Sequence, residues 1–217
     1  MIQDSMKMQN LDRDPNGAEE FVFLLHGLAA HRIVMARLTS HLKRCGYTVK
    51  NWGYPSIRSP IRDHAESLRN DVRQVAEDPS VSRIHFVTHS MGSIITRCAL
   101  LDERFSKLAR IVMLGPPNHG SHVARTLSGP LGWFCPPLRE LSDVEGSFVN
   151  RLNEPEDLEI GVIAAGADLM VPRESTYLSC QREHIVIPGH HGVLPWKQET
   201  AVCVENFLRS GAFSQQA

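Results

Sequence analysis

The segment Thr88-His89-Ser90-Met91-Gly92 is the most informative part of this sequence for the fold. It follows a short apolar run at 83–88, which we expect to form a strand, and it opens a segment with helical spacing at 92–101. A serine on a sharp turn between strand and helix matches the G-x-S-x-G pattern, which lifts a serine hydroxyl clear of a sheet. Thr88 stands where that pattern has its first glycine, and an isolated serine here is also a common helix N-cap. The neighbouring segments must therefore decide its role.

Short apolar runs alternate with amphipathic segments on both sides of this turn. Continuous apolar runs are typical of strands that are buried on both faces of a parallel sheet covered by helices. The sequence thus predicts the α/β class, with a mostly parallel open sheet of about six strands flanked by helices. The expected strands are 21–25, 47–52, 83–88, 108–114, 159–165 and 184–187, and the expected helices are 34–45, 61–75, 92–101 and 197–208.

The length of 217 residues favours a single domain, which we place at 19–217. Residues 1–18 are polar and aperiodic, so we expect a flexible N-terminal tail without the apolar core of a secretory signal. The segment 118–152 interrupts the alternation of strands and helices. An insertion of about 35 residues at a strand end is expected to form a cap or lid.

Composition excludes several classes of function. The net charge of −1 leaves no basic excess to hold a nucleic-acid backbone. No apolar run approaches the roughly 18 residues of a transmembrane segment. The five cysteines are widely spaced and form no C-x-x-C pair, which is typical of reduced thiols, so we expect a cytoplasmic protein.

Two further residues follow Ser90 in an order that indicates a catalytic triad. Asp168 comes directly after the strand expected at 159–165, and His191 comes after the last expected strand. Open α/β sheets place their sites at the carboxyl ends of strands, where all three residues would meet. An aspartate after glycine is also a common turn residue, and His190 is an alternative general base beside His191.

Backbone N–H groups near Ser90 are candidates for an oxyanion hole. His26-Gly27-Leu28 follows the first expected strand, and Met91 follows the serine. We expect the N–H groups of Leu28 and Met91 to face a developing negative charge, although the first turn can also be a plain strand end. Candidate residues for lining a substrate pocket are His26, Asn118, His119, Trp133 and Phe134. The alternatives are loop polar groups bonded to backbone and, for the two aromatic residues, a satellite core.

Taken in this order, the motifs resemble the α/β-hydrolase superfamily, in particular its small lipase- and esterase-like serine hydrolases. The resemblance extends from about Glu20 to Phe213 and is carried by His26 to Leu28, Gly46-Tyr47, Tyr54 to Ser56, the Ser90 turn, Gly115 to Ser121, Asp168 in G-x-D-x-x-V-P, and a closing histidine. In related sequences two residues separate a proline from the catalytic histidine, so counting from Pro188 favours His191.

The resemblance implies hydrolysis of a carboxylic ester through an acyl-enzyme, with Ser90 as nucleophile, His191 as base and Asp168 as its partner. It does not imply a particular substrate; we expect a small-molecule ester or a lipid, and no cofactor. The same residues would also serve an acyltransferase or a thioesterase, and a non-catalytic binding protein on this fold is a further alternative. The oligomeric state stays open.

Eleven histidines invite a second interpretation, because histidine is also the commonest metal ligand. His119 and His122 would need a regular helix to share a face, and Gly120 lies between them. No H-E-x-x-H pattern accompanies them. We therefore expect no metal.

Overall fold

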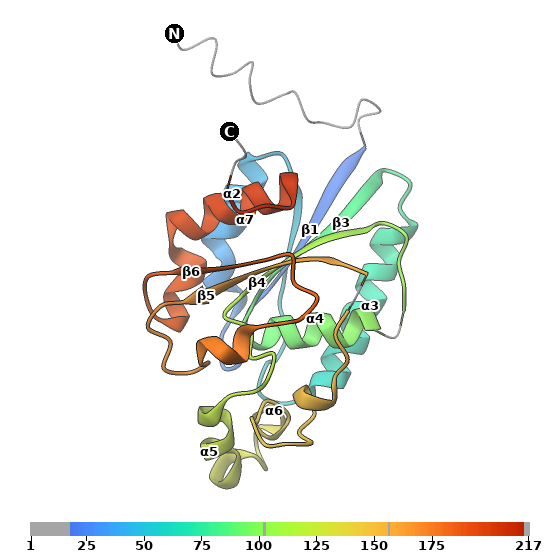
Figure 1. Ribbon diagram of the computed structural model, residues 1–217. Coiled ribbons are helices and arrows are strands. Elements are labelled where there is room, and N and C mark those ends of the chain that lie inside the picture. Colours follow the sequence, from blue (N-terminus) through green and yellow to red (C-terminus); the bar gives the residue numbers. More distant parts are fainter. Residues whose placement is uncertain (1–17, 102, 156, 215–217) are drawn as a thin grey trace.

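The computed structural model describes residues 18–101, 103–155 and 157–214 (Figure 1). Within these residues, six strands form one sheet in the order β2-β1-β3-β4-β5-β6, and every neighbouring pair is parallel. The prediction of a six-stranded open α/β sheet is confirmed. The strands are β1 (Glu19–Leu25), β2 (Thr48–Trp52), β3 (Val81–His89), β4 (Leu108–Leu114), β5 (Glu159–Ala165) and β6 (Glu183–Ile187).

Helices cover both faces of the sheet (Figure 1). On one face lie α3 (Ile61–Glu77) and α4 (Met91–Leu101), and on the other lie α2 (Ala36–Arg44) and α7 (Gln198–Ser210). A 3₁₀ turn, η2 (Arg32–Met35), precedes α2, so the helix expected at 34–45 begins instead as a tighter turn. The side chain of His31 accepts the N–H of Ile33 and starts that turn.

The sheet separates two apolar clusters. Successive side chains of a strand point to opposite faces, so in β1 Phe23 and Leu25 pack toward α3 and α4, while Val22 and Leu24 pack toward α2 and α7. All four are fully buried. This is why the sequence shows continuous apolar runs rather than alternation.

The parallel register brings the carboxyl ends of the strands to one edge. Leu25 pairs with Thr88, and His89 pairs with Leu114. Beyond the last strand pairs, the ladder continues into the loops, because Ser90 N donates to Leu114 O at 2.9 Å and Gly115 donates to β5 at 2.8 Å. The loops that carry Ser90, Asp168 and His191 therefore leave the sheet at the same edge.

The insertion at 118–152 forms a small helical cap. It contains α5 (His122–Leu131), α6 (Pro136–Glu140) and a 3₁₀ turn, η3 (Val149–Arg151). In Figure 1, α5 and α6 lie beyond one end of the sheet. Glu140 of α6 accepts the N–H of Ile61, the first residue of α3, at 2.8 Å. Two more 3₁₀ turns, η4 (Arg173–Thr176) and η5 (His191–Trp196), follow β5 and β6.

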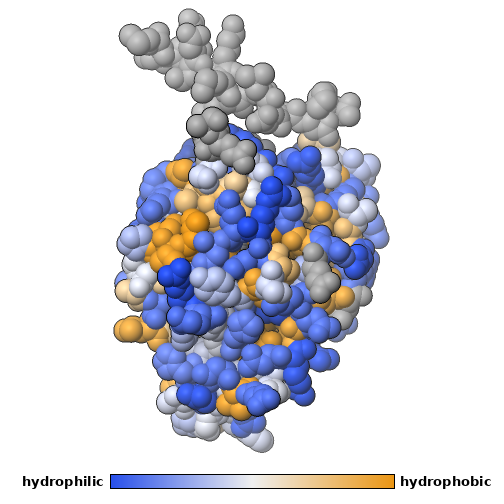
Figure 2. Space-filling view, in the orientation of Figure 1, coloured by the Kyte–Doolittle hydropathy of each residue, from blue (hydrophilic) through white to orange (hydrophobic). Residues whose placement is uncertain are grey.

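The surface is mixed in character. On the face shown in Figure 2, hydrophilic residues interrupt the apolar ones. No helix in the described part of the chain is both long and apolar enough to cross a membrane. Of the tail expected at 1–18, residues 1–17 lie outside the described residues.

Arg97 on α4 holds both ends of the cap. Its side chain is only 2% exposed, and its guanidinium donates to the carbonyl and side-chain oxygens of Asn118 and to the carbonyls of Leu152 and Asn153. These acceptors are the first residue of the insertion and the residues at its end. A buried charge is costly unless it is hydrogen-bonded, and the bonds of Nη1 and Nη2 tie the start of the cap to its end. The buried Nε has no hydrogen-bond partner among the described residues.

We predict that Arg97→Ala lowers the free energy of unfolding by about 2–4 kcal/mol, because four buried or partly buried acceptors lose a charged donor. Urea denaturation measures the change. Arg58→Ala, which removes an exposed arginine, should change stability by less than about 0.5 kcal/mol. Equal effects of the two substitutions would contradict the role of Arg97.

Candidate active site

Ser90 occupies the turn between β3 and α4 in a strained backbone conformation. Its φ is +53°, and among the described non-glycine residues only Ala29 also has a positive φ. Such left-handed backbone is unfavourable for a residue with a side chain and clusters at functional sites. The turn is short, since β3 ends at His89 and α4 begins at Met91.

Two glycines make room for this turn. A Cβ at Gly27 would lie 2.9 Å from the Ser90 Cβ and 3.4 Å from its Oγ. A Cβ at Gly92 would lie 2.7 Å from the carbonyl oxygen of His26. Neither position has room for a side chain. The turn His26-Gly27-Leu28, called the H-G-L turn below, can therefore pack closely against the serine turn.

Asp168 and His191 form a close pair. His191 Nδ1 lies 2.7 Å from Asp168 Oδ2, and both side chains are almost fully buried. The other carboxylate oxygen, Oδ1, accepts the N–H groups of Met170 and Val171 at 2.9 Å each. The carboxylate is thus held from both sides, while His190 is exposed and is the N-cap of η5.

The environment keeps Asp168 ionised. Burial alone would raise the pKa of this carboxyl, but the hydrogen bond and charge of His191 and the two backbone N–H groups outweigh it, so the pKa lies below its usual value. An ionised carboxylate at Nδ1 keeps the proton on that nitrogen and leaves Nε2 as the nitrogen that can accept one.

The His191 ring lies at the end of β4, next to the serine turn. A Cβ at Gly115 would be 3.0 Å from His191 Cε1, and Leu114, the residue before this glycine, accepts the N–H of Ser90. Within the described residues Ser90 Oγ has no hydrogen bond to His191. Such contacts are often long without substrate and tighten when one is bound.

His89 contacts both the ring and the backbone of His191, the candidate general base. Its ring centroid lies 4.8 Å from that of His191, and His89 Nε2 donates to the carbonyl oxygen of His191 at 3.1 Å. Burial and the neighbouring His191 lower the pKa of His89 to about 3, so it stays neutral at physiological pH. Its side chain therefore adds no positive charge beside His191.

The backbone N–H groups of Leu28 and Met91 are the two that the sequence predicts to bind an oxyanion. In the described chain, neither Leu28 N nor Met91 N donates a hydrogen bond to another protein group. Met91 is the first residue of α4, where the helix dipole also favours negative charge. Tyr54 holds the start of the turn that leads to Leu28, because its hydroxyl donates to His26 O at 2.6 Å.

The five candidate residues for a substrate pocket separate into two groups. His26 and Asn118 are buried: His26 stacks on Tyr54 at 4.3 Å, and Asn118 bonds Arg97 and Thr176 O. Both support loops. Three are exposed, namely His119, Trp133 and Phe134, the last two to 80% and 76%. The aromatic pair therefore does not form a satellite core.

Sequence reasoning missed the contacts made by Tyr54 and Arg97, which fix the two loops beside Ser90. Tyr54 stands out in the sequence only as part of a short motif, and Arg97 lies within an otherwise apolar helix. A single arginine inside such a helix is a signal that could have predicted a buried, hydrogen-bonded arginine.

The cap is also joined to the Asp168 loop, because Ser121 Oγ donates to Met170 O at 2.5 Å.

A separate cavity of about 910 Å³ lies away from this site. It is found where α4 ends and β4 begins, at the other end of α4 from Ser90, and is bordered by residues including Leu100, Phe105 and Glu154. The length of α4 therefore separates it from the Ser90 turn.

The six-stranded parallel sheet, with a serine turn after β3 and acid and histidine after β5 and β6, is the α/β-hydrolase fold. The comparisons with solved structures agree. The mature form of a Bacillus licheniformis lipase matches with a TM-score of 0.73 at 16% identity, over 93% of this chain and 95% of that one.

Two further structures extend this likeness. An esterase of Pyrococcus furiosus matches with a TM-score of 0.62 at 19% identity, over 92% of this chain and 85% of that one. Lipase B of Aspergillus fumigatus matches with a TM-score of 0.71 at 15% identity, over 93% of this chain and 56% of that one. No protein-family model and no curated protein sequence matches this chain. At these identities the likeness establishes the fold.

Burial of His89 leads to a prediction about how stability depends on pH. Between about pH 6.5 and pH 3 the unfolded chain protonates His89 and the folded chain does not, so acid favours unfolding. We predict that the loss of unfolding free energy between pH 7 and pH 5 is smaller in His89→Gln by about 2 kcal/mol. Denaturant titrations at both pH values measure it. A His89→Gln variant with the wild-type pH dependence would contradict the assignment.

Proposed function

We propose that this protein is a serine hydrolase that cleaves carboxylic esters, with Ser90, His191 and Asp168 as its triad. The observation that carries the proposal is Ser90 at φ +53°, raised on the turn before α4 beside a histidine whose Nδ1 bonds a buried carboxylate. Lipases and an esterase among the structural neighbours support the same class of reaction.

In the proposed mechanism, Ser90 Oγ attacks the ester carbonyl carbon while His191 Nε2 takes the hydroxyl proton. The carbonyl oxygen becomes an oxyanion, which the N–H groups of Leu28 and Met91 bind. His191 then gives its proton to the leaving alcohol. Asp168 stabilises the imidazolium and holds the ring in one orientation.

The second half of the reaction uses the same groups. His191 takes a proton from water, the water oxygen attacks the acyl-enzyme, and the carboxylic acid leaves as Ser90 recovers its proton. His89 and Tyr54 act as positioning residues, since one contacts the His191 backbone and the other holds the H-G-L turn.

The substrate class proposed is a small-molecule ester or a lipid. Exposed apolar side chains of the cap favour a substrate with an acyl chain; they are Leu127, Leu131, Trp133 and Phe134. The five cysteines, all described, form no disulfide, and this supports a reducing, cytoplasmic location.

The proposal is tested with p-nitrophenyl esters of rising chain length. The wild-type protein should release p-nitrophenol in repeated turnovers, and Ser90→Ala should lose at least about 10³-fold in kcat with an unchanged circular dichroism spectrum. A folded wild-type protein without turnover on any ester of the series, or a Ser90→Ala variant with full activity, would refute it.

Replacing the acid of the triad gives a sharper prediction. Asp168→Asn should lower kcat by about 10⁴-fold with little change in KM, because the amide no longer selects the tautomer of His191 or stabilises its positive charge. Glu174→Gln is the matched control, since it removes an exposed carboxylate from the same loop. It should retain activity within about twofold. A similar loss in both variants would point to loop charge rather than to a triad.

The exposed aromatic side chains of the cap lead us to predict a preference for lipid-like substrates. Replacing Trp133 and Phe134 together with serine should lower the rate on an emulsified long-chain ester about tenfold, because two large exposed rings lose contact with the lipid surface. The rate on a dissolved short-chain ester should change less than about twofold. Val202→Ser, which removes an exposed apolar side chain from α7, is the control. Equal changes on the two substrates would contradict the role of the aromatic pair.

A further inference from the structure

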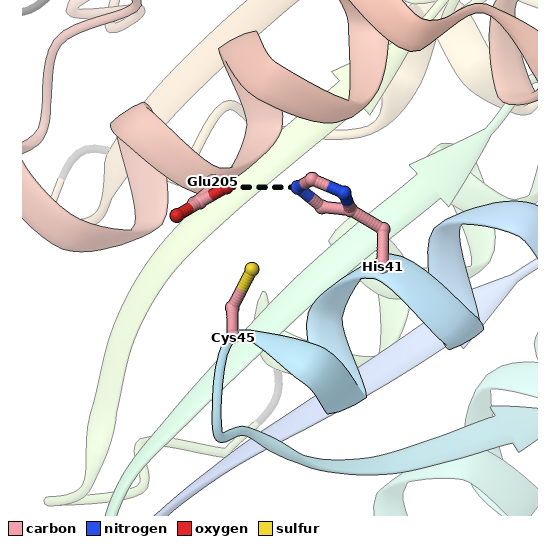
Figure 3. A group of neighbouring side chains, drawn as sticks. All are labelled: His41, Cys45 and Glu205. Atoms are coloured by element: carbon pink, nitrogen blue, oxygen red, sulfur yellow. Dashed lines mark hydrogen bonds and ion pairs between the residues drawn. The ribbon is translucent and has the colours of Figure 1, made fainter. Parts of the chain in front are cut away.

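A second cluster of reactive side chains lies between α2 and α7, two helices on the same face of the sheet (Figure 1). His41 and Cys45 come from the C-terminal end of α2, and Glu205 comes from α7 (Figure 3). The cluster is separate from the triad, whose residues leave the sheet at its carboxyl edge. The proposed hydrolysis does not use it.

The side chains of His41, Cys45 and Glu205 lie close together. His41 and Cys45 are four residues apart and share a helix face. His41 Nε2 lies 2.8 Å from Glu205 Oε2, and the Cys45 sulfur completes a group in which all three atoms lie within 4.8 Å of one another (Figure 3). The His41 and Glu205 side chains are 12% and 21% exposed, so the point is sheltered yet reachable from solvent.

These distances are close to those of a zinc site. Zinc bonds of about 2.0–2.3 Å in a tetrahedron separate the ligand atoms by about 3.3–3.8 Å. Rotations of three side chains that move the atoms by about 1 Å would bring the group to this geometry. No shift of the helices is required, because the imidazole and carboxylate already touch.

The charge and chemistry of the donors also fit. A thiolate and a carboxylate together balance the charge of a dication, and the imidazole adds a neutral donor. Sulfur with imidazole nitrogen favours zinc over magnesium or calcium. Arg209 binds the other carboxylate oxygen, Glu205 Oε1, at 3.2 Å. This outer contact orients the carboxylate and leaves Oε2 to face the cluster.

A nucleophilic or redox role for Cys45 fits less well. Burial, together with the charge of Glu205 and the hydrogen bond to it, raises the pKa of the thiol to about 12. Reactive cysteines have lowered values and electropositive surroundings. No second cysteine among the described residues is paired with it.

We propose that His41, Cys45 and Glu205 form a Zn²⁺ site, completed by a water molecule, that fastens α2 to α7. Such a site would also affect the proposed general base, because α7 begins two residues after η5, the turn that starts at His191. A cation that joins the helices would stabilise the C-terminal segment that carries the proposed general base. The expectation of no metal rested on residues adjacent in sequence, whereas Glu205 is distant from the other two.

Cobalt is the first probe, because Co²⁺ replaces zinc and reports its ligands by absorption. Metal-free, reduced protein titrated with Co²⁺ should develop a thiolate-to-cobalt charge-transfer band in the near ultraviolet and visible bands of tetrahedral intensity, saturating at one equivalent. Cys45→Ser should abolish the charge-transfer band. Cys203→Ser, a half-buried thiol on the same helix as Glu205, should leave it unchanged. A missing band, or one that survives in Cys45→Ser, would overturn the proposal.

Thermal unfolding is the second measurement and does not depend on ester hydrolysis. Zn²⁺ at 100 times its Kd should raise the Tm of the wild-type protein by about 5–10 °C. Glu205→Gln, which keeps the size of the side chain, should lose most of this shift, and Cys203→Ser should retain it. No shift in the wild type, or an equal shift in Glu205→Gln, would overturn the site while leaving the proposed triad untouched.

Discussion

The sharp turn at Ser90 determines how the strands, helices and loops around the candidate site are arranged. A residue with a side chain at φ +53° costs about 1–3 kcal/mol, and it persists only where its surroundings leave no alternative. Here β3 lies inside the sheet and α4 is buried along nearly its whole length. Gly27 and Gly92 leave room for the loop after β1 to pack closely against the Ser90 turn. The burial of β3 and α4 therefore outweighs the strain and holds the hydroxyl at the edge of the sheet.

The same helix organises the two loops that flank the serine. At its N-terminal end α4 presents the N–H of Met91, and in the middle of the helix Arg97 binds both ends of the cap. On the other side, His89 at the end of β3 supports the backbone of His191. The nucleophile turn and the cap thus depend on α4, and the histidine loop is held by the strand that precedes this helix.

Much of this arrangement could be predicted from the sequence, because strands buried on both faces have a clear apolar pattern. The strands expected at 108–114 and 159–165 have the observed bounds, and the expected sheet has six strands. The Asp168–His191 contact followed from residue order along the chain. Local patterns could not predict what depends on distant partners. The clamp by Arg97, the exposure of Trp133 and the meeting of His41 with Glu205 all require the packed helices.

Covalent reaction with a fluorophosphonate shows whether Ser90 is an activated nucleophile. This reagent phosphonylates a serine only where a base and an oxyanion hole activate it. Intact mass spectrometry of the folded wild-type protein should show one adduct per chain, and peptide mapping should locate it at Ser90. No adduct, an adduct on another residue, or equal labelling of Ser90→Ala would contradict the account.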